Sequence, residues 1–218
     1  KIDPEIEKHM HHILDSGQAL LSIINDILSF SSLEFDHSEL LKKPFSTDKI
    51  FSHINTNFVK KARHKNIDLS WKKQQGLPNN FLGDFPKLIF AINNVVDNAI
   101  KFTNPGGTVA IEINAQTTAK KSVPIQLAFL IKDTGIGIAP EYLDNLFEAF
   151  TQEDTSSTRS YGGVGIGLTL TKKILDKMNG QISVKSELNQ GTTVLITCPF
   201  EMPAKEESRP DNFAIDSN

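Results

Sequence analysis

The run Asn94-Val95-Val96-Asp97-Asn98-Ala99-Ile100-Lys101-Phe102-Thr103 is the stretch of this chain that says most about its fold. On a helix, residues four and seven positions apart share one face, so Asn94, Asn98 and Lys101 would line up along a single stripe. Carboxamide oxygens suit Mg²⁺ as ligands, and an ammonium is a point charge that suits phosphate. The stripe therefore predicts a site for Mg²⁺ and a polyphosphate that needs no carboxylate.

The alternative for this stripe is an ordinary solvated polar face. The surrounding sequence argues against that alternative, because the asparagines lie in an otherwise apolar run made of Phe90, Ala91, Ile92, Val95, Val96, Ala99 and Ile100. A buried amide without a partner costs about 1–3 kcal/mol. Each asparagine therefore needs a partner, in the protein or in a ligand.

Length and composition limit what the chain can be. The 218 residues predict one or two domains. A net charge of −3 gives no electrostatic basis for binding nucleic acid or an anionic membrane. The single cysteine, Cys198, lies in an apolar run, which predicts a small buried core residue. No apolar stretch approaches the ~18 residues of a membrane span, and no signal peptide is present.

The first segment predicts one long helix, from about Pro4 to about Phe35, and the start at Lys1 without a methionine suggests a fragment of a longer protein. Two offset heptad series form its seam, and their members are Met10, Gly17, Ile24 and Ser31, and Ile6, Ile13, Leu20 and Ile27. Such a seam needs a partner helix. Three histidines, at positions 9, 11 and 12, lack the i,i+4 spacing of a ligand pair, so they favour a solvated face over a metal site.

After Lys42-Lys43-Pro44, which breaks the heptad pattern, helices and strands alternate. Helices are predicted from Ser46 or Thr47 to about 65, from Pro86 to about 103, from Pro140 through Phe150, and from Gly167 to Met178. Strands are predicted at 67–71, 81–84, 109–113, 125–131, 182–184 and 193–197, the second of these being a strand or a loop. Residues 151–163 read as a mobile loop, and the tail from Pro203 reads as a linker.

Two glycine clusters lie at the ends of predicted elements. Asp133-Thr134-Gly135-Ile136-Gly137 directly follows a strand. Its glycines would let the backbone approach a flat ligand, and its carboxylate can accept a hydrogen bond from the exocyclic amine of adenine. Taken alone, this short motif also fits an ordinary turn at the end of a strand.

The second cluster, Gly162-Gly163-Val164-Gly165-Ile166-Gly167-Leu168, leads into a helix. Backbone N–H groups at a helix start can hold phosphate. The spacing does not match the dinucleotide-binding fingerprint, and no Gly-Lys-Ser/Thr follows to make a Walker A loop. The alternative for this cluster alone is a flexible hinge.

Together, four motifs in order resemble the N, G1, F and G2 boxes of sensor histidine kinases: Asn94 to Thr103, Asp133 to Gly137, Phe147-Glu148-Ala149-Phe150, and Gly163 to Gly167. Residues 45–200 resemble the catalytic ATP-binding domain that these kinases share with DNA gyrase B, Hsp90 and MutL. Residues 4–35 resemble the second helix of the dimerisation and phosphotransfer hairpin. The stretch from Leu146 to Gln152 and on to Gly163 is most similar to hybrid kinases, which carry a receiver domain downstream.

The resemblance implies an α+β fold, in which a two-layer α/β sandwich of the Bergerat type, with a mixed sheet and helices on one face, follows one long helix. It divides the chain into a partial hairpin helix at 1–40, the catalytic domain at 41–202 and a C-terminal linker at 203–218. The ATP-binding residues that it implies are Asn94, Asn98, Lys101, Phe102, Asp133, Gly135, Gly137, Phe147, Arg159, Gly163, Gly165, Gly167 and Leu168.

The resemblance also implies the roles of these residues. Asn94 and Asn98 would hold Mg²⁺ and the phosphates, Lys101 would contact a phosphate, and Phe102 would lie against the base or the ribose. Asp133 would accept from the adenine amine, and the two glycines after it would admit the ring. The loop at 151–163 would form a lid, from which Arg159 reaches the terminal phosphate, with Phe147 and Phe150 as its anchors.

Two departures from the family pattern stand out. Val164 occupies a position where the family often has Thr or Ser, which puts one hydroxyl contact to phosphate in doubt. The phosphoacceptor histidine, which the family follows with an acidic residue and an Arg-x-Pro pattern, is missing, because none of the six histidines has such a neighbour. The first hairpin helix is therefore expected to lie outside the fragment.

The sequence thus predicts the ATP-binding part of a two-component sensor histidine kinase, which passes the γ-phosphoryl of ATP to a histidine and then to a receiver aspartate. ATP and Mg²⁺ are the expected cofactors. The expected partners are a receiver domain and a second copy of the full-length protein, and the expected place is the cytosolic part of a bacterial inner-membrane sensor. The alternatives are an ATP-driven clamp of the same fold and a degenerate docking module without chemistry.

Overall fold

The structure of the chain is a computed structural model. It describes residues 39–116, 124–149 and 165–203 without interruption, and helical residues at intervals between Glu5 and Leu28. Several sequence predictions lie outside the described residues: the loop at 151–163 with Arg159, the positions Phe150, Gly163 and Val164, the histidines His11 and His12, and the linker from residue 204 onward.

The described residues of the first segment are helical, in agreement with the predicted long helix. Apolar side chains of its predicted seam are exposed: Ile6 by 55%, Met10 by 50%, Ile13 by 71% and Leu20 by 57%. An exposed apolar seam is what a helix that packs against a partner presents. Within the described part of the chain, no helix is both long and apolar enough to cross a membrane.

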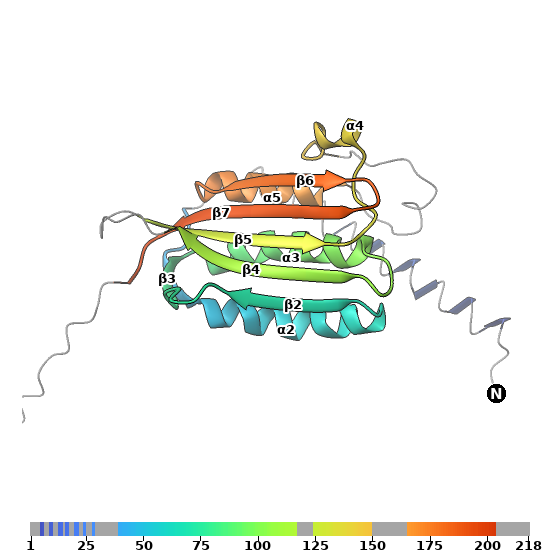
Figure 1. Ribbon diagram of the computed structural model, residues 1–218, viewed down its shortest axis with the longest axis horizontal. Coiled ribbons are helices and arrows are strands. Elements are labelled where there is room, and N and C mark those ends of the chain that lie inside the picture. The colour runs from blue at the N-terminus through green and yellow to red at the C-terminus, as the bar shows by residue number, and fades with distance from the viewer. Residues whose placement is uncertain are drawn as a thin grey trace, which may run out of the picture.

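A five-stranded mixed sheet forms one layer of the domain (Figure 1). Its order is β2 (Asp68–Lys73), β4 (Thr108–Gln116), β5 (Ile125–Asp133), β7 (Gly191–Phe200) and β6 (Gln181–Glu187). Strands β2 and β4 run parallel, and the other neighbours are antiparallel. The strands at the β6–β7 end are longer than the sequence predicted.

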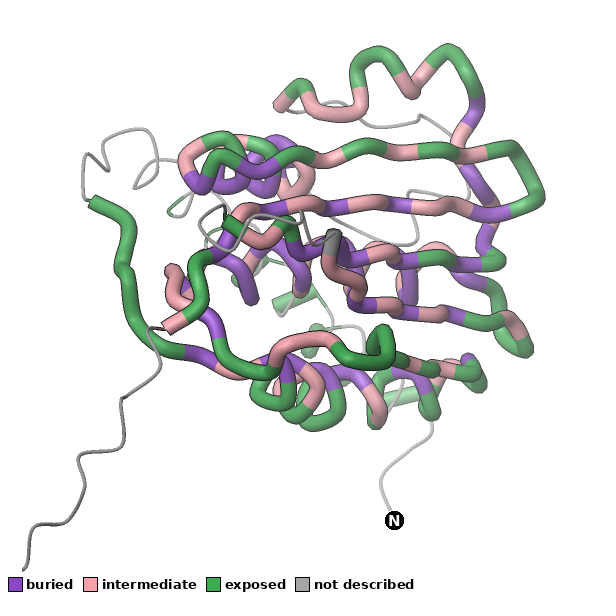
Figure 2. Tube along the Cα trace, turned by 60° about the vertical axis from the view of Figure 1, so that its left-hand side comes forward, coloured by how far each residue is buried: buried purple, intermediate pink, exposed green. Residues whose placement is uncertain are grey.

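Three helices, α2 (Thr47–His64), α3 (Phe85–Phe102) and α5 (Gly167–Lys177), cover one face of this sheet (Figure 1). Burial alternates along β7, where one set of side chains enters the core and the other is partly accessible (Figure 2). This alternation is typical of an antiparallel sheet with one covered face. The two-layer sandwich with helices on one face is therefore confirmed.

Helix α2 begins and buries its face as the sequence predicts. The Ser46 side chain accepts a hydrogen bond from the Lys49 amide at 3.2 Å, which caps the first turn. The helix then buries one residue on each turn, and these residues are Ile50, Ile54, Phe58 and Ala62. On the other side of the core, Cys198 is buried in β7, and burial raises the pKa of its thiol to about 12.

Helix α3 has a buried acidic cap. Asp84 Oδ1 accepts from the Lys87 amide at 3.1 Å, and Oδ2 accepts from the Leu41 amide at 3.1 Å and from Lys87 Nζ at 3.3 Å. Pro86 stands in the first turn, as predicted. The Asp84 carboxylate therefore joins the segment that precedes the domain to the start of the helix that carries the asparagines.

The sequence analysis missed strand β1 (Lys43–Ser46), which pairs antiparallel with β3 (Asn80–Gly83) in a separate two-stranded sheet. The Pro44 that suggested only a break is tolerated, because a two-stranded ladder consists of edge strands. Aromatic packing explains the pairing, since Phe45 contacts Phe81 at 6.1 Å and Phe200 at 5.2 Å between ring centroids.

The predicted helix from Pro140 through Phe150 is wrong in its length. Helix α4 spans only Pro140–Leu143, and turns follow through residue 149. No residue of α4 is buried, and no side chain caps its first turn at Ala139. A helix gains most of its stability from packing an apolar face, so this segment has little to hold a longer one.

Candidate functional site

The predicted site residues gather at one end of the domain. The last turn of α3, the end of β5, the first turn of α5 and the turn between β6 and β7 all lie at the right-hand end of the view in Figure 1. Backbone bonds tie these pieces together, because Ile136 donates its N–H to the Phe102 carbonyl at 3.1 Å and accepts from the Asn189 amide at 2.7 Å.

The Asn94 carboxamide has a fixed orientation. Its Nδ2 donates to the Gly167 carbonyl at 3.4 Å and to Thr171 Oγ1 at 3.2 Å, and Thr171 in turn donates to Gly167 at 2.8 Å. The apolar surroundings of Asn94 predicted that its amide needs a partner, and the first residues of α5 provide it. Because the nitrogen is engaged, the oxygen is the atom left to serve a metal or another donor.

Asn98 and Lys101 continue the stripe predicted from their spacing. Asn94, Asn98 and Lys101 are half-buried, as is Phe102, whereas most of the apolar residues around them on α3 are buried. Lys101 Nζ lies 5.0 Å from the centroid of the Phe102 ring, a cation–π contact. In the described part of the chain no group of three or more His, Cys, Asp or Glu side chains could hold a metal ion. Carboxamide oxygens can serve as ligands of Mg²⁺, and the predicted role of the two asparagines as metal ligands stays a prediction.

Asp133 ends β5 and is only 6% exposed. Its Oδ1 accepts from the Gly135 amide at 2.8 Å and from the Thr192 amide at 3.2 Å. Burial raises the pKa of this carboxyl, and the two amide bonds oppose that shift. With both amides on Oδ1, the second oxygen is the one positioned to accept from a ligand.

Gly135 and Gly137 also have packing reasons to be glycine. A Cβ on Gly135 would lie 2.5 Å from the Phe102 carbonyl oxygen. Gly137 has φ +69°, and a Cβ there would fall on the Glu187 carbonyl oxygen. A tight fit between the loop, α3 and β6 thus accounts for these glycines, and their role in admitting the adenine ring stays a prediction.

Among the described residues, no side chain caps the start of α5. The N-cap residue is Ile166, and Gly165 before it has φ +73°. Uncapped N–H groups at such a start suit an anion. Among the described residues, a Cβ added at Gly167 would meet nothing closer than Asn94 Cγ and Oδ1, both at 3.9 Å. Leu168, the next residue of the predicted set, is half-buried.

Two parts of the predicted site are less complete. Phe147 is half-buried in the turns after α4, and its anchoring role stays a prediction together with those of Arg159 and Gly163. Sequence reasoning missed Asn189 in the β6–β7 turn and two residues at the start of β7: Thr192, which donates to Asp133, and Gly191, where an added Cβ would fall on the Asp133 carbonyl oxygen. Asn189-Gln190-Gly191 does read as a turn, but its contacts with the Asp133 loop are long-range and leave no local signal.

A sequence profile for the family described as "Histidine kinase-, DNA gyrase B-, and HSP90-like ATPase" matches residues 83–202, more than half of the chain. The chain belongs to this family. The matched range begins one residue before the Asp84 cap and ends after β7, so it includes α3, the Asp133 loop and α5. The ATP-binding fold expected from the four motifs is therefore confirmed.

Relatives of this ATPase domain are sensor kinases. The chain is 36% identical over 193 residues to the signal transduction histidine-protein kinase BarA of Escherichia coli K12, covering 88% of this chain and 21% of BarA. It is 34% identical over 206 residues to hybrid signal transduction histidine kinase A of Dictyostelium discoideum, covering 93% of this chain and 10% of that protein. The chain therefore spans about a fifth of BarA and a tenth of the Dictyostelium protein, and both relatives are histidine kinases.

Solved structures agree with the fold. Full-length ShkA in complex with AMPPNP matches with a TM-score of 0.73 and 28% identity, over 93% of this chain and 40% of ShkA. The histidine kinase ThkA in complex with the response regulator TrrA matches with a TM-score of 0.68 and 21% identity, over 91% of this chain and 53% of ThkA. At that identity, the second match speaks for the fold alone.

Proposed function

We propose that this histidine kinase-type ATPase domain binds MgATP between α3, the Asp133 loop and the start of α5, and serves as the phosphoryl donor site of a hybrid sensor kinase. The observation that carries the proposal is the orientation of Asn94, whose nitrogen is bound to Gly167 and Thr171. That geometry turns one amide oxygen toward the space beside an uncapped helix start. A metal ligand beside an anion-binding helix start suits a metal–polyphosphate.

In this proposal each residue has one task. The amide oxygens of Asn94 and Asn98 hold Mg²⁺, which when bound neutralises charge on the phosphates. The Lys101 ammonium contacts a phosphate, and the second oxygen of Asp133 accepts from the adenine amine. Phe102 lies against the base or the ribose. The domain contributes mainly position and charge to phosphoryl transfer.

The wider assignments are proposals on the same basis. Residues 1–40 would supply the second helix of a dimerisation hairpin, 41–202 the catalytic domain, and 203–218 a linker to a receiver domain. The exposed apolar seam of the first helix supports pairing with a second copy. No histidine of the chain has the acidic neighbour of a phosphoacceptor, so the acceptor would lie on another segment. The kinase would work at the cytosolic side of a membrane.

The competing function in the same family is an ATP-driven clamp. In clamp ATPases the residue four positions before the metal-binding asparagine is a glutamate that activates water, and here that residue is Asn94. An amide has no proton affinity near neutral pH and cannot act as a general base. General-base assistance is worth about 10²–10⁴-fold in rate. Hydrolysis should therefore be slow, which preserves the γ-phosphoryl for a histidine.

Two measurements on the 218-residue chain test the proposal. Calorimetric titration should show ATP binding that depends on Mg²⁺, is lost in Asn98→Ala, and is much weaker for GTP, whose carbonyl would face the Asp133 carboxylate. With [γ-³²P]ATP, label should stay off this chain and appear on a separate polypeptide that carries the acceptor helix. Steady phosphate release at the rate of a dedicated ATPase, abolished in Asn98→Ala, would favour the clamp instead.

A further inference from the structure

The last turn of α3 carries Lys101 and Phe102, and all four of its terminal carbonyls have donors. The final four carbonyls of a helix have no partner within the helix. Here the Ala99 carbonyl accepts from the Thr103 amide at 3.1 Å, and the Phe102 carbonyl accepts from the Ile136 amide at 3.1 Å. The two carbonyls between them, at Ile100 and Lys101, have a different kind of donor.

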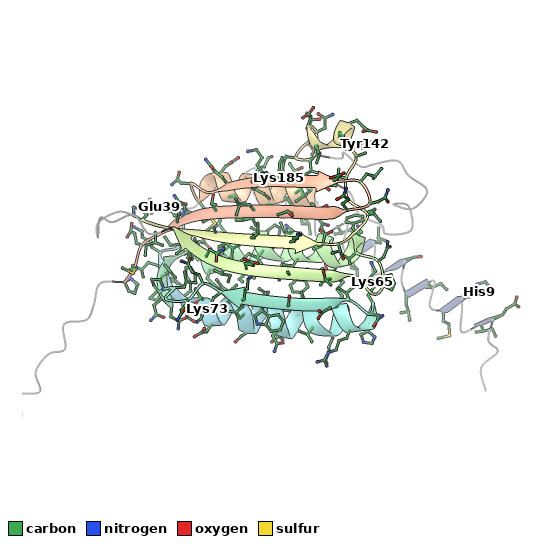
Figure 3. All side chains as sticks on the ribbon, viewed as in Figure 1. His9, Glu39, Lys65, Lys73, Tyr142 and Lys185 are labelled. Atoms are coloured by element: carbon green, nitrogen blue, oxygen red, sulfur yellow. The ribbon has the colours of Figure 1, made fainter. Side chains whose placement is uncertain are left out.

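That donor is the ammonium of Lys65. Its Nζ donates to the Ile100 carbonyl at 3.0 Å and also to the Lys101 carbonyl. Lys65 is the C-cap residue of α2, where its own amide bonds to Lys61 and Ala62, so its backbone is fixed as well. Figure 3 labels Lys65 at the same end of the domain as the candidate site.

Opposing influences act on the charge of Lys65. The side chain is half-buried, and burial, followed by the charge of Lys61, lowers its pKa. A cation at a helix C-terminus interacts favourably with the helix dipole and satisfies its last carbonyls. Lys65 therefore holds the backbone of the turn that carries the Lys101 side chain. Lys65 belongs to the end of α2, and α2 contributes none of the proposed nucleotide contacts.

We propose that Lys65 is a positioning residue for phosphate recognition, which fixes the last turn of α3 so that the Lys101 ammonium reaches the polyphosphate. This inference rests on the proposed role of Lys101 in the proposed function. It does not make Lys65 a ligand of the nucleotide. Its effect should therefore appear in the preference for ATP over adenosine, which has the same base and sugar but no phosphate.

The chain offers a matched control at Lys61, one turn earlier on α2. Lys61 Nζ forms an ion pair with Asp97 of α3, so it joins the same two helices. Both lysines line the same groove between α2 and α3. Substituting either lysine by methionine removes one positive charge and the bonds of that side chain to α3, but of the two lysines it is Lys65 that bonds to the Ile100 and Lys101 carbonyls.

The experiment measures affinity for MgATP by calorimetry and for adenosine by NMR titration, with thermal unfolding as a check of folding. Lys65→Met should lower the preference for ATP by about three- to tenfold, in the range expected for a charged partner at a helix C-terminus. Lys61→Met should leave the preference unchanged, and Lys65→Arg, which keeps charged donors, should recover part of it. Equal effects of Lys61→Met and Lys65→Met would overturn the inference. The two lysines would then act alike, either by holding α2 against α3 or through their positive charge.

A double-mutant cycle separates this inference from the proposal beneath it. Lys101→Met should lower the preference for ATP by about tenfold or more, as loss of a charged hydrogen bond to phosphate does. If Lys65 acts through Lys101, adding Lys65→Met to Lys101→Met should change the preference little further. A full additive loss overturns the inference alone. If Lys101→Met has no effect, the proposed role of Lys101 and the inference both fail.

Discussion

The Asn189 amide donates to the Ile136 carbonyl at 2.7 Å, and this bond fastens the loop after β5 to the turn between β6 and β7. On its other side the Ile136 amide reaches the Phe102 carbonyl at 3.1 Å. Backbone hydrogen bonds thus hold the loop that carries the proposed adenine contact between α3 and the β6–β7 turn. A site fixed in this way loses little freedom when a ligand binds.

Gly137→Ala should destabilise the fold. The residue has φ +69°, and a Cβ would fall on the Glu187 carbonyl oxygen. The left-handed backbone alone costs a non-glycine residue about 1–2 kcal/mol, and the clash adds to it. Chemical denaturation should show a loss of at least about 1 kcal/mol. Gly76→Ala is the control for positive φ without a clash, since Gly76 has φ +77° and no atom within 4 Å of the added Cβ. If both variants lose the same stability, the proposed packing against β6 is not the cause.

Gly167→Ala should leave the fold intact and weaken MgATP binding. Gly167 is the first residue of α5, and among the described residues the new Cβ would meet nothing closer than 3.9 Å, so alanine should fit there without strain. That Cβ would nevertheless lie next to Asn94 Oδ1, the proposed metal ligand. We expect unchanged stability in denaturation and weaker MgATP binding in calorimetry. Undiminished MgATP affinity would argue that the phosphates do not pass this point.

Asp133→Asn should change the dependence of stability on pH. Burial raises the pKa of Asp133 above its ordinary 3.8. A group whose pKa is raised by folding contributes stability that is full below the unfolded pKa and is lost as pH rises through the folded pKa. The variant, which cannot ionise, should therefore gain stability relative to the parent as pH rises from about 4 toward neutrality.

Asp133→Asn should also bind ATP more weakly than the parent. An asparagine still offers Oδ1 to the Gly135 and Thr192 amides, but its NH₂ group would face the adenine amine, so two donors would meet. Denaturation curves over pH and calorimetry on parent and variant check both halves. A variant that is less stable than the parent at neutral pH, or that binds ATP as well, contradicts the assigned environment of Asp133.

Local sequence patterns predicted much of the candidate site. The positions of Asn94, Asn98 and Lys101 follow from helical period, and Asp133 follows from its place at the end of an apolar strand. Both signals lie within about ten residues. What escaped were contacts between distant segments, such as Thr192 on Asp133 and Lys65 on the last turn of α3. No local preference records these contacts, because tertiary packing creates them.

The same reasoning explains the two errors in the fold. Strand β1 was missed because a proline and two lysines hide a four-residue strand whose partner, β3, lies more than thirty residues away. Helix α4 was drawn too long because Pro140 correctly marked a start, but the end of a helix depends on whether its next turn finds a surface to cover. The residues that start a helix can be read from the local sequence, whereas the surface against which its later turns pack depends on distant segments.

Thr169→Val should preserve or raise stability. Thr169 is only 8% exposed, and within the described chain its hydroxyl is a fully buried polar atom without a hydrogen-bond partner. An unsatisfied buried hydroxyl costs about 1–3 kcal/mol, and valine has nearly the same shape. Thr171→Val is the contrasting variant, because the Thr171 hydroxyl bonds to Gly167 and Asn94. Thermal unfolding should rank Thr169→Val at or above the parent and Thr171→Val below it. The reverse order would mean that Thr169 has a partner.

Leu41→Pro should loosen the start of α3 from outside the helix. The Leu41 amide donates to Asp84 Oδ2, and the almost fully buried Asp84 carboxylate also accepts from the amide and the ammonium of Lys87 in the first turn of α3. Proline removes the donor and leaves the cap residue in place. Loss of one hydrogen bond to a buried charged group is worth about 1.5–3 kcal/mol. We expect a loss of stability of that order and faster hydrogen exchange at the Lys87 and Leu88 amides.

The control is Leu40→Pro, one residue upstream, which should have little effect on stability or on exchange at these amides. Helix α3 extends about 27 Å from this cap to Phe102, so exchange at the Thr103 amide should stay as slow as in the parent if the helix is released only at its first turn. Equal losses in both proline variants would show that the peptide geometry, and not the bond to Asp84, holds this segment against the domain.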